Sequence, residues 1–397
     1  MTQHALPTPV PQTLRTSGVL ALLVLLAIGL AVAAYRFVFG LSAATNLDQQ
    51  HPWGLWIAFD VATGVALAAG GFTTAALAHV LHRRNYRAIT RPALLTAMLG
   101  YTFVAVGLLA DLGRYYNIWH PMLPSMWQGN SVLFEVGMCV MCYLTVLYIE
   151  FLPVVCERLV GEARWPRLAR LAGRVHRLVE RTMFFFILAG VVLSCLHQSS
   201  LGTLMVIAPS KVHPLWYTPI LPLLFLLSAI AVGFPMVIVE SLYASWSVKL
   251  RPELELLSSL ARTIPVILGV YLAVKIADLL LRDAVSYLVD GSIQSLMWWI
   301  EVALGVALPL AILISPTARR SRQWLFGAAL LVVAGVAVNR INVFLVSYQP
   351  PYAVRDYFPS AGEIAVTIGL VSGLILAYRV IVTYLPVLSA PAAGRAT

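Results

Sequence analysis

The sequence predicts an all-α integral membrane protein, and three observations support this. Hydrophobic residues make up 60% of the chain and charged residues 11%, with a mean hydropathy of +0.85, values typical of polytopic membrane proteins. Apolar runs of about 20 residues recur along the chain, each long enough to cross about 30 Å of hydrocarbon. The runs are continuously apolar and do not alternate, which favours helices over a β-barrel.

Ten such runs follow one another, and the fifth is the shortest. They cover about 17–39, 54–81, 92–113, 131–155, 182–198, 217–243, 261–282, 295–315, 323–345 and 361–385. The first run resembles the apolar core of a secretory signal, but we interpret it as a retained helix. The membrane domain therefore covers 17–385, between tails at 1–16 and 386–397. Within it we expect two four-helix bundles, spans 2–5 (about 54–198) and spans 6–9 (about 217–345), flanked by spans 1 and 10.

The positive charges predict the orientation of these spans. Lys and Arg gather in the loops after spans 2, 4, 6 and 8, at 83–91, 158–181, 249–262 and 319–322. The positive-inside rule makes these loops cytoplasmic, and with them both chain termini. The same loops account for the net charge of +10 without a nucleic-acid partner, and they suit contact with anionic lipid.

Five polar residues fall in the opposite leaflet of four consecutive spans. They are Asp60, Asp111, Arg114, Glu135 and His197. A charge inside the membrane costs about 3 kcal/mol on insertion scales, so such residues are usually paired or functional. Any one of them alone is also compatible with a structural role at a helix end. Together they predict a polar pocket between spans 2–5, near the outer surface.

Spacing suggests how these residues are used. Asp111 and Arg114 are three apart and can pair on one helix face, with Tyr115 at four from Asp111; a purely structural pair remains an equal alternative. Glu135 has no opposite charge at three or four residues in its own span, which suits a group that takes up and releases protons.

Other acids extend the pattern toward the cytoplasm. Glu150 follows Glu135 by fifteen residues, about 22 Å along a helix on nearly the same face, so the two are candidate ends of a proton path. The alternative for Glu150 is a side chain that reaches the membrane interface. Glu240 lies near the cytoplasmic end of span 6. In spans 7–9 we expect mainly internal charge pairing, such as Lys275 with Asp278, and further buried charges at Glu301 and Arg340.

The sequence lacks the residues that several cofactors need as ligands. His79 and His197 are the histidines at span ends, and they lie on opposite sides of the membrane, which argues against a bis-histidine haem. Cys139-x-x-Cys142 is followed by Tyr143 and so lacks the c-type haem signature. Four scattered cysteines provide no iron–sulfur cluster, and no metal motif is present. Acids, a histidine and aromatics without a metal set suit a quinone headgroup, which needs hydrogen-bond donors and two protons for each reduction.

Eight segments resemble, in order, those of the polysulfide reductase membrane subunit (NrfD/PsrC) family, and most closely its HybB-type branch in periplasmic nickel–iron hydrogenases. They are "HPWGLWIAFDVATG", "RPALL", "DLGRYYN", "NSVLFE", "HQSSLG", "KVHPLW", "WWIEV" and "YFPSAGE". The resemblance runs from about span 1 to span 10. It implies a bacterial inner-membrane subunit without haem or iron–sulfur cluster of its own, which passes electrons to menaquinone or ubiquinone near the periplasmic face. It also implies paired four-helix bundles.

The resemblance further implies partners and site residues. The partners would be a periplasmic ferredoxin-like iron–sulfur subunit and the small and large nickel–iron subunits of a hydrogenase. The match places Glu135 on the family's membrane glutamate and Asp60, Arg114 and His197 in its other polar motifs, without settling which of them touches quinone. From the residues we assign proton handling to Glu135, Asp60 and His197, and the quinone pocket to Asp111, Arg114, Tyr115 and His197. Glu150 and Glu240 remain candidates for a proton path, and no residue is assigned to a metal. On its own the chain would not be a catalyst.

Two alternatives stay open beside other oxidoreductases of the family, which act on polysulfide, nitrite or sulfur compounds. A passive membrane anchor would use the acids only structurally. A secondary transporter would use Asp60, Glu135 and Lys275 for ion coupling, with Pro235 and Pro265 as weak signs of broken helices.

Overall fold

The computed structural model describes residues 7–80, 86–161, 165–248 and 253–388, and it is helical throughout its membrane spans. All ten predicted spans are confirmed as helices long and apolar enough to cross a membrane. Within the described residues no strand forms, apart from an isolated antiparallel bridge between Val212 and Tyr348. Parts of the predicted tails and of the basic loops, at 1–6, 81–85, 162–164, 249–252 and 389–397, lie outside the described residues.

The first predicted bundle is present. Span 2 is a succession of short helices: η1 (Trp56–Thr63), α3 (Gly64–Leu67), α4 (Ala69–Ala75) and η2 (Ala76–Val80). Spans 3, 4 and 5 are single helices, α5 (Arg87–Asp111), α6 (Val132–Val160) and α7 (Pro166–Val206). Helix α5 packs on span 2 and on α6, α6 packs on α7, and α7 closes the ring against α4. The first stretch of span 2, η1, is a π-helix, a form often found at functional sites.

The second bundle contains spans 6–9. Its elements are α8 (Leu221–Val248), α9 (Leu254–Leu260), α10 (Ile264–Leu281), η7 (Ala284–Leu288), α11 (Ile293–Val302), η8 (Ala303–Ala307), α12 (Leu308–Ile314), α13 (Pro316–Arg320), α14 (Arg322–Ile341) and η9 (Asn342–Val346). Helix α8 packs on α10 and α14, while α12 packs on both α10 and α14. Gly305 in η8 and Gly335 in α14 face each other so closely that a Cβ on Gly335 would lie 2.2 Å from the Gly305 Cα.

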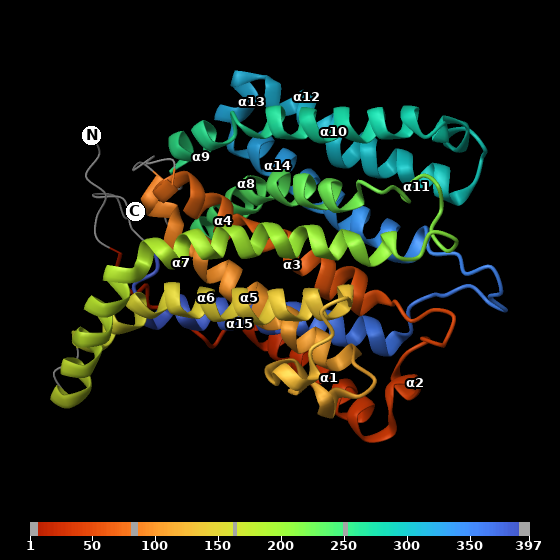
Figure 1. The fold of residues 1–397 in the computed structure, drawn as a ribbon. Helices are drawn as coiled ribbons and strands as arrows, with labels where there is room; N and C mark the ends of the chain where they lie inside the picture. Colours follow the sequence, from red (N-terminus) through yellow and green to blue (C-terminus); the bar gives the residue numbers. More distant parts are fainter. Residues whose placement is uncertain (1–6, 81–85, 162–164, 249–252, 389–397) are drawn as a thin grey trace.

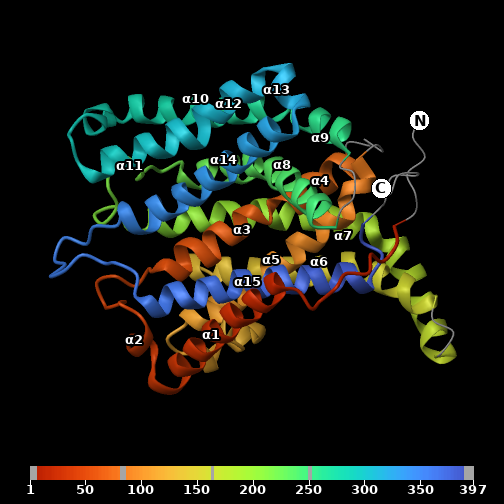
Figure 2. The same ribbon diagram turned by 180° about the vertical axis from the view of Figure 1, so that it is seen from behind.

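Spans 1 and 10 form a pair beside the first bundle. Helix α1 (Ser17–Phe39) is followed by the short α2 (Leu41–Ala44), and α15 (Ala361–Tyr384) is the last helix. Helices α1 and α15 pack on each other, and α15 packs on α5 and η1. The crossing depends on two glycines, since a Cβ on Gly29 would lie 2.8 Å from the Gly369 Cα. Figures 1 and 2 show this pair on the side of the molecule away from α10 and α12.

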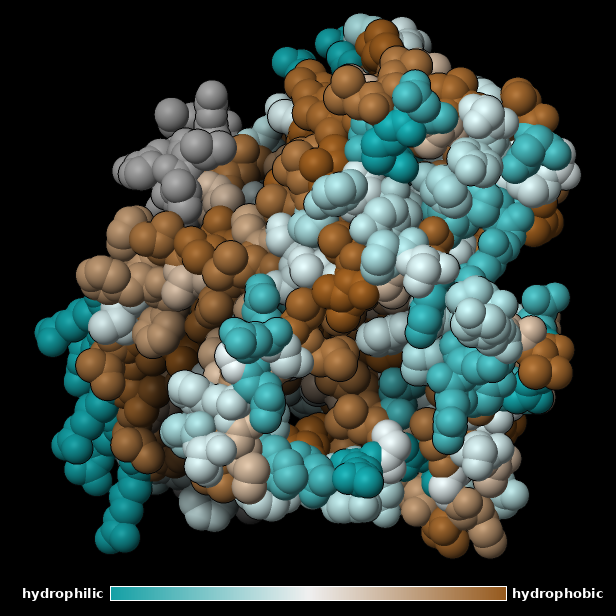
Figure 3. Space-filling view, turned by 45° about the vertical axis from the view of Figure 1, so that its right-hand side comes forward, coloured by the Kyte–Doolittle hydropathy of each residue, from teal (hydrophilic) through white to brown (hydrophobic). Residues whose placement is uncertain are grey.

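The two ends of the helix array differ, and we name them by their residues. The long-loop end carries the segments 45–55, 112–131, 207–220, 282–292 and 347–360; the basic end carries the α6–α7 connection, the residues around α9 and α13, the start of α1 and the end of α15. In the space-filling view, which brings the long-loop end forward, that end is largely pale or hydrophilic, whereas the flank of the molecule is brown with apolar residues (Figure 3).

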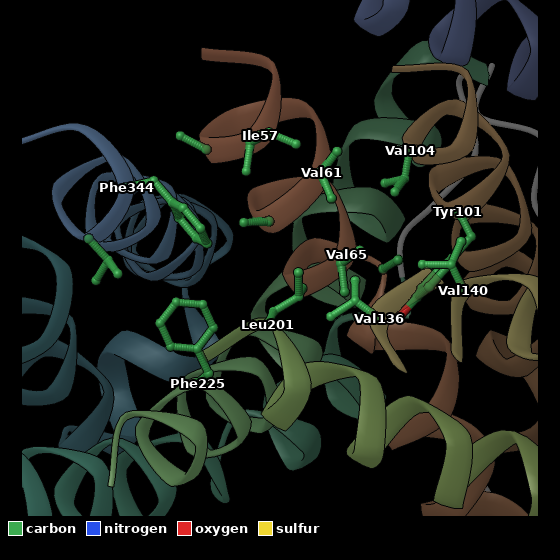
Figure 4. Packing of buried hydrophobic residues seen from close by; sticks show 14 of the residues in the cluster. Ile57, Val61, Val65, Tyr101, Val104, Val136, Val140, Leu201, Phe225 and Phe344 are labelled. Atoms are coloured by element: carbon green, nitrogen blue, oxygen red, sulfur yellow. The ribbon is translucent and has the colours of Figure 1, made fainter. Parts of the chain in front are cut away.

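The two bundles share one core. Ile57 and Val61 of η1 face Leu201 of α7, and across from them lie Phe225 of α8 and Phe344 of η9 (Figure 4). The ring centroids of Phe225 and Phe344 are 6.2 Å apart at an angle of 72°, an edge-to-face arrangement. The bundles are therefore packed as one body through the long-loop half of the membrane domain.

The predicted boundaries of span 5 were wrong. Span 5 was expected at 182–198, but α7 runs from Pro166 to Val206, because the arginine-rich segment before it continues the helix. Arg, Leu and Ala are strong helix formers, and Pro166 occupies a first-turn position where proline is tolerated. Span 7, predicted at about 261–282, corresponds to α10; the short α9 precedes it, and Pro265 lies in the first turn of α10.

Candidate functional site

A polar stripe on α7 crosses the first bundle. Ser194, His197 and Ser200 are three residues apart, so they lie on one helix face, and all three are buried. In an apolar chain this stripe must find partners on neighbouring helices, because an unpaired polar group in the membrane is costly. Those partners come from α5 and α6.

His197 lies at the centre of the stripe. It is 0% exposed, and its Nδ1 shares a 3.1 Å hydrogen bond with the hydroxyl of Tyr101 on α5. Tyr101 in turn packs edge-on against Tyr143 of α6, with ring centroids 4.6 Å apart. The Ser194 Oγ lies beside both tyrosines and interacts with their hydroxyl groups, whereas the His197 Nε2 is buried and unpartnered within the described residues. Neither tyrosine was singled out from the sequence, because aromatics in an apolar span usually serve packing.

Glu135 meets this stripe at its long-loop end. Ser131 caps α6, with its side chain accepting from the Phe134 N–H, and Glu135 follows in the first turn. The Ser200 Oγ donates to Glu135 Oε1 over 2.5 Å. The Glu135 side chain is exposed at the bundle surface, so it does not lie inside a closed pocket as expected. Through this hydrogen bond Glu135 links the surface of the bundle to Ser200 of α7, and His197 lies one turn before Ser200.

Glu150 of α6 lies beyond the other end of the stripe, toward the basic end. It is 8% exposed and lines a small cavity with Tyr143, Leu147 and Gly190 that has room for about one water molecule. A Cβ on Gly190 would lie 2.8 Å from Glu150 Oε1, so the glycine provides the space for the carboxyl group. Glu150 is therefore turned into the bundle and does not reach the membrane interface.

A second cluster lies at the long-loop end of spans 1, 2, 3 and 10. Asp60 is buried in η1, and its Oδ2 accepts a 2.7 Å hydrogen bond from Thr367 of α15. Gly107 of α5 lies directly opposite, where a Cβ would come within 3.2 Å of the Asp60 Cβ. Asp60 also interacts electrostatically with Asp111, at the end of α5. The structure therefore brings the two predicted aspartates together.

The positive charge next to Asp111 comes from Arg36 of α1. Arg36 is 1% exposed, donates to the carbonyl oxygen of Leu112, and interacts electrostatically with Asp111. Its guanidinium lies 5.2 Å from the ring centroid of Tyr115. The Asp111 Oδ1 and the Arg36 Nε are buried and have no hydrogen-bond partner within the described residues. These two unpartnered atoms and the tyrosine form a site that can bind a polar headgroup.

Arg114 occupies a different place from the one expected. Helix α5 ends at Asp111, so the three-residue helical spacing between Asp111 and Arg114 does not exist in the folded chain. The Arg114 side chain is exposed, and no ion pair joins it to Asp111. The predicted Asp111–Arg114 pair is therefore wrong.

Two of the quoted sequence segments meet beside this cluster. Gly54 and Trp56 of "HPWGLW" contact Tyr357 and Glu363 of "YFPSAGE": the Trp56 Nε1 donates to the Glu363 carbonyl over 3.1 Å, and a Cβ on Gly54 would lie 2.8 Å from both Glu363 Oε1 and the Tyr357 hydroxyl. Glu363 forms a capping box with Ser360 at the start of α15 and accepts from the Tyr357 hydroxyl. Glu363 also interacts electrostatically with Asp111, so it extends the acid cluster.

Glu240 lies apart from both groups. Its Oε1 accepts a 3.0 Å hydrogen bond from the hydroxyl of Tyr378 on α15, and Thr96 of α5 lies beside it. Helix α15 thus binds one carboxyl group near each of its ends, Asp60 through Thr367 and Glu240 through Tyr378.

The second bundle has its own charge network. The Lys275 ammonium donates to Glu301, which also accepts from Trp216, Asn339 and Asn342. The predicted Lys275–Asp278 pair is wrong, because Asp278 binds Arg282 instead, with 2.7 Å between the Arg282 and Asp278 atoms. The spacing of three residues along one helix could not reveal that Lys275 pairs with Glu301 of the neighbouring helix α11.

Arg340 completes this network. It is fully buried, donates to Ser228 and to the Phe225 carbonyl of α8, and its guanidinium lies 3.7 Å from the Phe225 ring centroid. The Lys275–Glu301 ion pair joins buried charges between helices, as expected, whereas Arg340 contacts neutral groups of α8 and so holds α14 against α8.

The described residues do not supply a bis-histidine haem site. Among the histidines whose side chains the structure describes, none faces His197 from another membrane helix: His51, His120 and His213 lie at the long-loop end, and His176 lies in α7 itself. No group of three or more His, Cys, Asp or Glu in the described part of the chain is arranged for a metal ion. The absence of haem and of iron–sulfur clusters stays a prediction.

The chain belongs to a family of membrane subunits of oxidoreductases. The family model "Polysulphide reductase, NrfD" matches residues 43–351, which include both bundles. This membership confirms the family that the eight segments of the sequence resemble.

Curated relatives match along almost the whole chain. The chain is 36% identical over 367 residues to the "Probable Ni/Fe-hydrogenase 2 b-type cytochrome subunit" of Escherichia coli K12, covering 92% of this chain and 90% of that protein. It is 28% identical over 378 residues to the "Menaquinone reductase, integral membrane subunit" of Nitratidesulfovibrio vulgaris, covering 89% and 88%. Another protein of that organism is 38% identical over 389 residues, covering 95% and 96%.

Proposed function

We propose that this protein is the quinone-reactive membrane subunit of a respiratory oxidoreductase, and that its catalytic partner is a nickel–iron hydrogenase. The small and large hydrogenase subunits would supply electrons to a periplasmic ferredoxin-like iron–sulfur subunit. From there the electrons would pass through this protein to menaquinone or ubiquinone. The names of the Escherichia coli and Nitratidesulfovibrio relatives, one a hydrogenase subunit and one a menaquinone reductase subunit, support this assignment.

The polar route through the first bundle carries the proposal. It runs from Glu135 through Ser200 to His197 and Tyr101, and then past Tyr143 to Glu150. Ser200 and His197 lie one turn apart on α7, and the other neighbours are joined by a hydrogen bond, by ring contact or by a shared cavity with room for about one water. A quinone that gains two electrons also needs two protons, and a series of exchangeable groups can deliver them. The buried and unpartnered His197 Nε2 also supports the proposal, because buried polar groups in a purely structural set are usually hydrogen-bonded.

The acid cluster at the long-loop end is the quinone site in this proposal. A quinone carbonyl accepts hydrogen bonds, so the buried Arg36 Nε is a suitable donor, and Tyr115 provides an aromatic face. Asp60 and Asp111 would then transfer protons to the reduced oxygens. Arg36 was not expected in this role, and it replaces Arg114 in the proposed pocket.

The proposed orientation follows the basic loops. The long-loop end faces the periplasm, and the basic end faces the cytoplasm of a bacterial inner membrane. This places the acid cluster close to an iron–sulfur subunit docked on the periplasmic side, so that electrons travel a short distance to the quinone.

The test is quinone reduction by the purified complex with hydrogen as donor, comparing the native chain with Glu135→Gln. We expect a fall of at least tenfold, since a positioned acid–base group contributes roughly 10²–10⁴-fold. An artificial acceptor that takes electrons from the hydrogenase subunits must give native rates, which shows that the complex is assembled. Glu255→Gln, at an exposed acid of α9, is the matched control and should leave both activities unchanged.

Other outcomes identify the alternatives. Native quinone reduction in Glu135→Gln would contradict the proton role and favour a passive anchor. A native complex without any hydrogen-dependent activity would point to another oxidoreductase of the family. A haem spectrum from the purified chain would overturn the prediction that it carries no haem.

A further inference from the structure

The α6–α7 hairpin extends beyond the other helices at the basic end. Helix α7 has 41 residues, so it is about 61 Å long at 1.5 Å per residue, whereas crossing the membrane takes about 20 residues. Both ribbon views show the yellow-green end of the hairpin projecting past the rest of the molecule (Figures 1 and 2). The projecting part of α7 is its N-terminal portion, approximately 166–181.

Arginines form a stripe along this projection. They are spaced alternately by three and four residues, which places them on one face of the helix, and every one is exposed: Arg167, Arg170, Arg174, Arg177 and Arg181. None of the five forms an ion pair with a described residue; Arg170 donates only to the Pro166 carbonyl in its own first turn. The acid on this part of α7, Glu180, is paired with His176. The stripe therefore carries uncompensated positive charge.

An apolar ridge runs beside the arginine stripe. Leu171, Leu178, Phe185 and Val192 are seven residues apart in succession, and their exposed fractions are 56%, 63%, 69% and 50%. At 100° per residue this ridge lies next to the arginines, whereas Ala172 and Val179 are buried on the side that packs on α6. Exposed apolar side chains in a membrane span face lipid. The ridge continues without a break from the span into the projection, so both carry the same exposed apolar face.

We propose that the N-terminal portion of α7, residues 166–181, binds anionic phospholipid of the leaflet at the basic end. Leu171 and Leu178 would enter the apolar edge of the leaflet, and the five guanidinium groups would bind lipid phosphates. An apolar strip beside a basic strip is the pattern of helices that lie at membrane interfaces, and clusters of four to eight basic residues next to a span bind acidic lipids. Figure 3 shows hydrophilic atoms beside brown surface at the lower left, where the hairpin lies.

Lipid is favoured over a soluble acidic partner by this continuity. A soluble protein would have to cover Leu171 and Leu178 at the point where the ridge leaves the bilayer, whereas lipid already surrounds Phe185 one heptad further along. The five charges complement phosphate, because two oxygens of one phosphate group can each accept a hydrogen bond from the same guanidinium.

The test measures hydrogen exchange of 166–181 in the full-length protein held in nanodiscs. Discs of phosphatidylcholine alone are compared with discs containing phosphatidylglycerol at about one lipid in three. We expect exchange to slow at least fivefold in the anionic discs and to return toward the neutral-disc rate at high salt, because screening weakens charge contacts. Equal rates in the two kinds of disc would overturn the proposal.

A variant with all five arginines replaced (R167Q, R170Q, R174Q, R177Q, R181Q) should lose the lipid-dependent slowing. The control carries R320Q and R322Q in another basic segment and should behave as native. Slowing that persists in the five-residue variant, or that free inorganic phosphate reproduces in neutral discs, would contradict a lipid site. If that variant does not fold, counting the phosphatidylglycerol retained by the native chain, with and without high salt, decides the question: retention that does not depend on salt would overturn the proposal.

Discussion

Asp48 shows how one carboxylate organises the segment that leads into span 2. Its oxygens accept from the backbone N–H groups of His51 and Gln50 and contact the side chains of His51 and Arg355. These hydrogen bonds, with that of the His51 backbone the largest, lower the pKa of Asp48 to about 2. The turn that they hold places Gly54 against Glu363, and so fixes one side of the acid cluster.

A pH dependence follows from the lowered pKa of Asp48. A carboxyl group whose pKa is lower in the folded chain stabilises the fold above its ordinary pKa, near 4, and this stability is lost as the pH falls toward 2. We therefore expect the protection of the amides in 46–52, relative to an unfolded chain at the same pH, to fall between about pH 4 and pH 2, and we expect Asp48→Asn to show low protection there already at neutral pH. Exchange in Asp48→Asn that matches the native chain at pH 7 would contradict this role.

Some residues of the candidate site could be predicted from the sequence, and others could not. Asp60, Asp111 and His197 were identifiable because a charge or an imidazole inside an apolar run is unusual. Arg36 and Glu363 belong to spans 1 and 10, which were expected only to flank the bundles, so their charges were not connected to the pocket. Their partners lie more than 70 residues away, and no helical spacing encodes such a contact.

Glycine pairs decide how closely the helices cross. Gly305 and Gly335 bring η8 and α14 into backbone contact, and Gly29 and Gly369 do the same for α1 and α15. Small residues at such crossings let helices pack without a hydrophobic driving force between them. From the sequence, ten spans and two bundles could be predicted, because hydropathy reports burial in lipid. The crossings and the π-helical stretches could not, because they depend on which helices meet.

We expect Gly335→Leu to destabilise the second bundle by about 1–3 kcal/mol, since its side chain must push η8 away from α14. The measurement is the thermal unfolding midpoint of the purified protein in detergent. Gly327→Leu is the control in the same helix, because no atom lies within 4 Å of a Cβ there. A midpoint for Gly335→Leu equal to that of the control would contradict the packing role of the pair.

Across the whole molecule, the two bundles use their buried polar residues differently. In the first bundle polar groups reach from Glu135 to Glu150. In the second, the network around Lys275 and Glu301 lies toward the long-loop end, and the basic half is filled by apolar side chains such as Leu257, Leu313 and Leu325; Glu240 of α8 is the exception and faces Tyr378 of α15. We therefore propose a proton route through the first bundle and a structural role for the network of the second.

This division predicts different effects of removing charge. Glu301→Gln alone leaves Lys275 as an unpaired buried cation and should destabilise the protein by about 3–5 kcal/mol. Combining it with Lys275→Met should restore much of that stability, and the folded complex should reduce quinone within about twofold of the native rate. The checks are the unfolding midpoint and hydrogen-driven quinone reduction. A folded double variant without quinone reduction would place the second bundle in the reaction.

The pairing of α1 with α15 also determines the order in which the protein can be completed during its synthesis. The first span enters the membrane early, but the helix that holds it is made last, on the order of tens of seconds later at about 5–20 residues per second. Arg36 can already meet Leu112 and Asp111 at the end of span 3, but until α15 is made Asp60 lacks Thr367 and Asp111 lacks Glu363. The site that we assign to quinone is thus finished by the last helix, so an incomplete chain in the membrane has both bundles but no functional pocket.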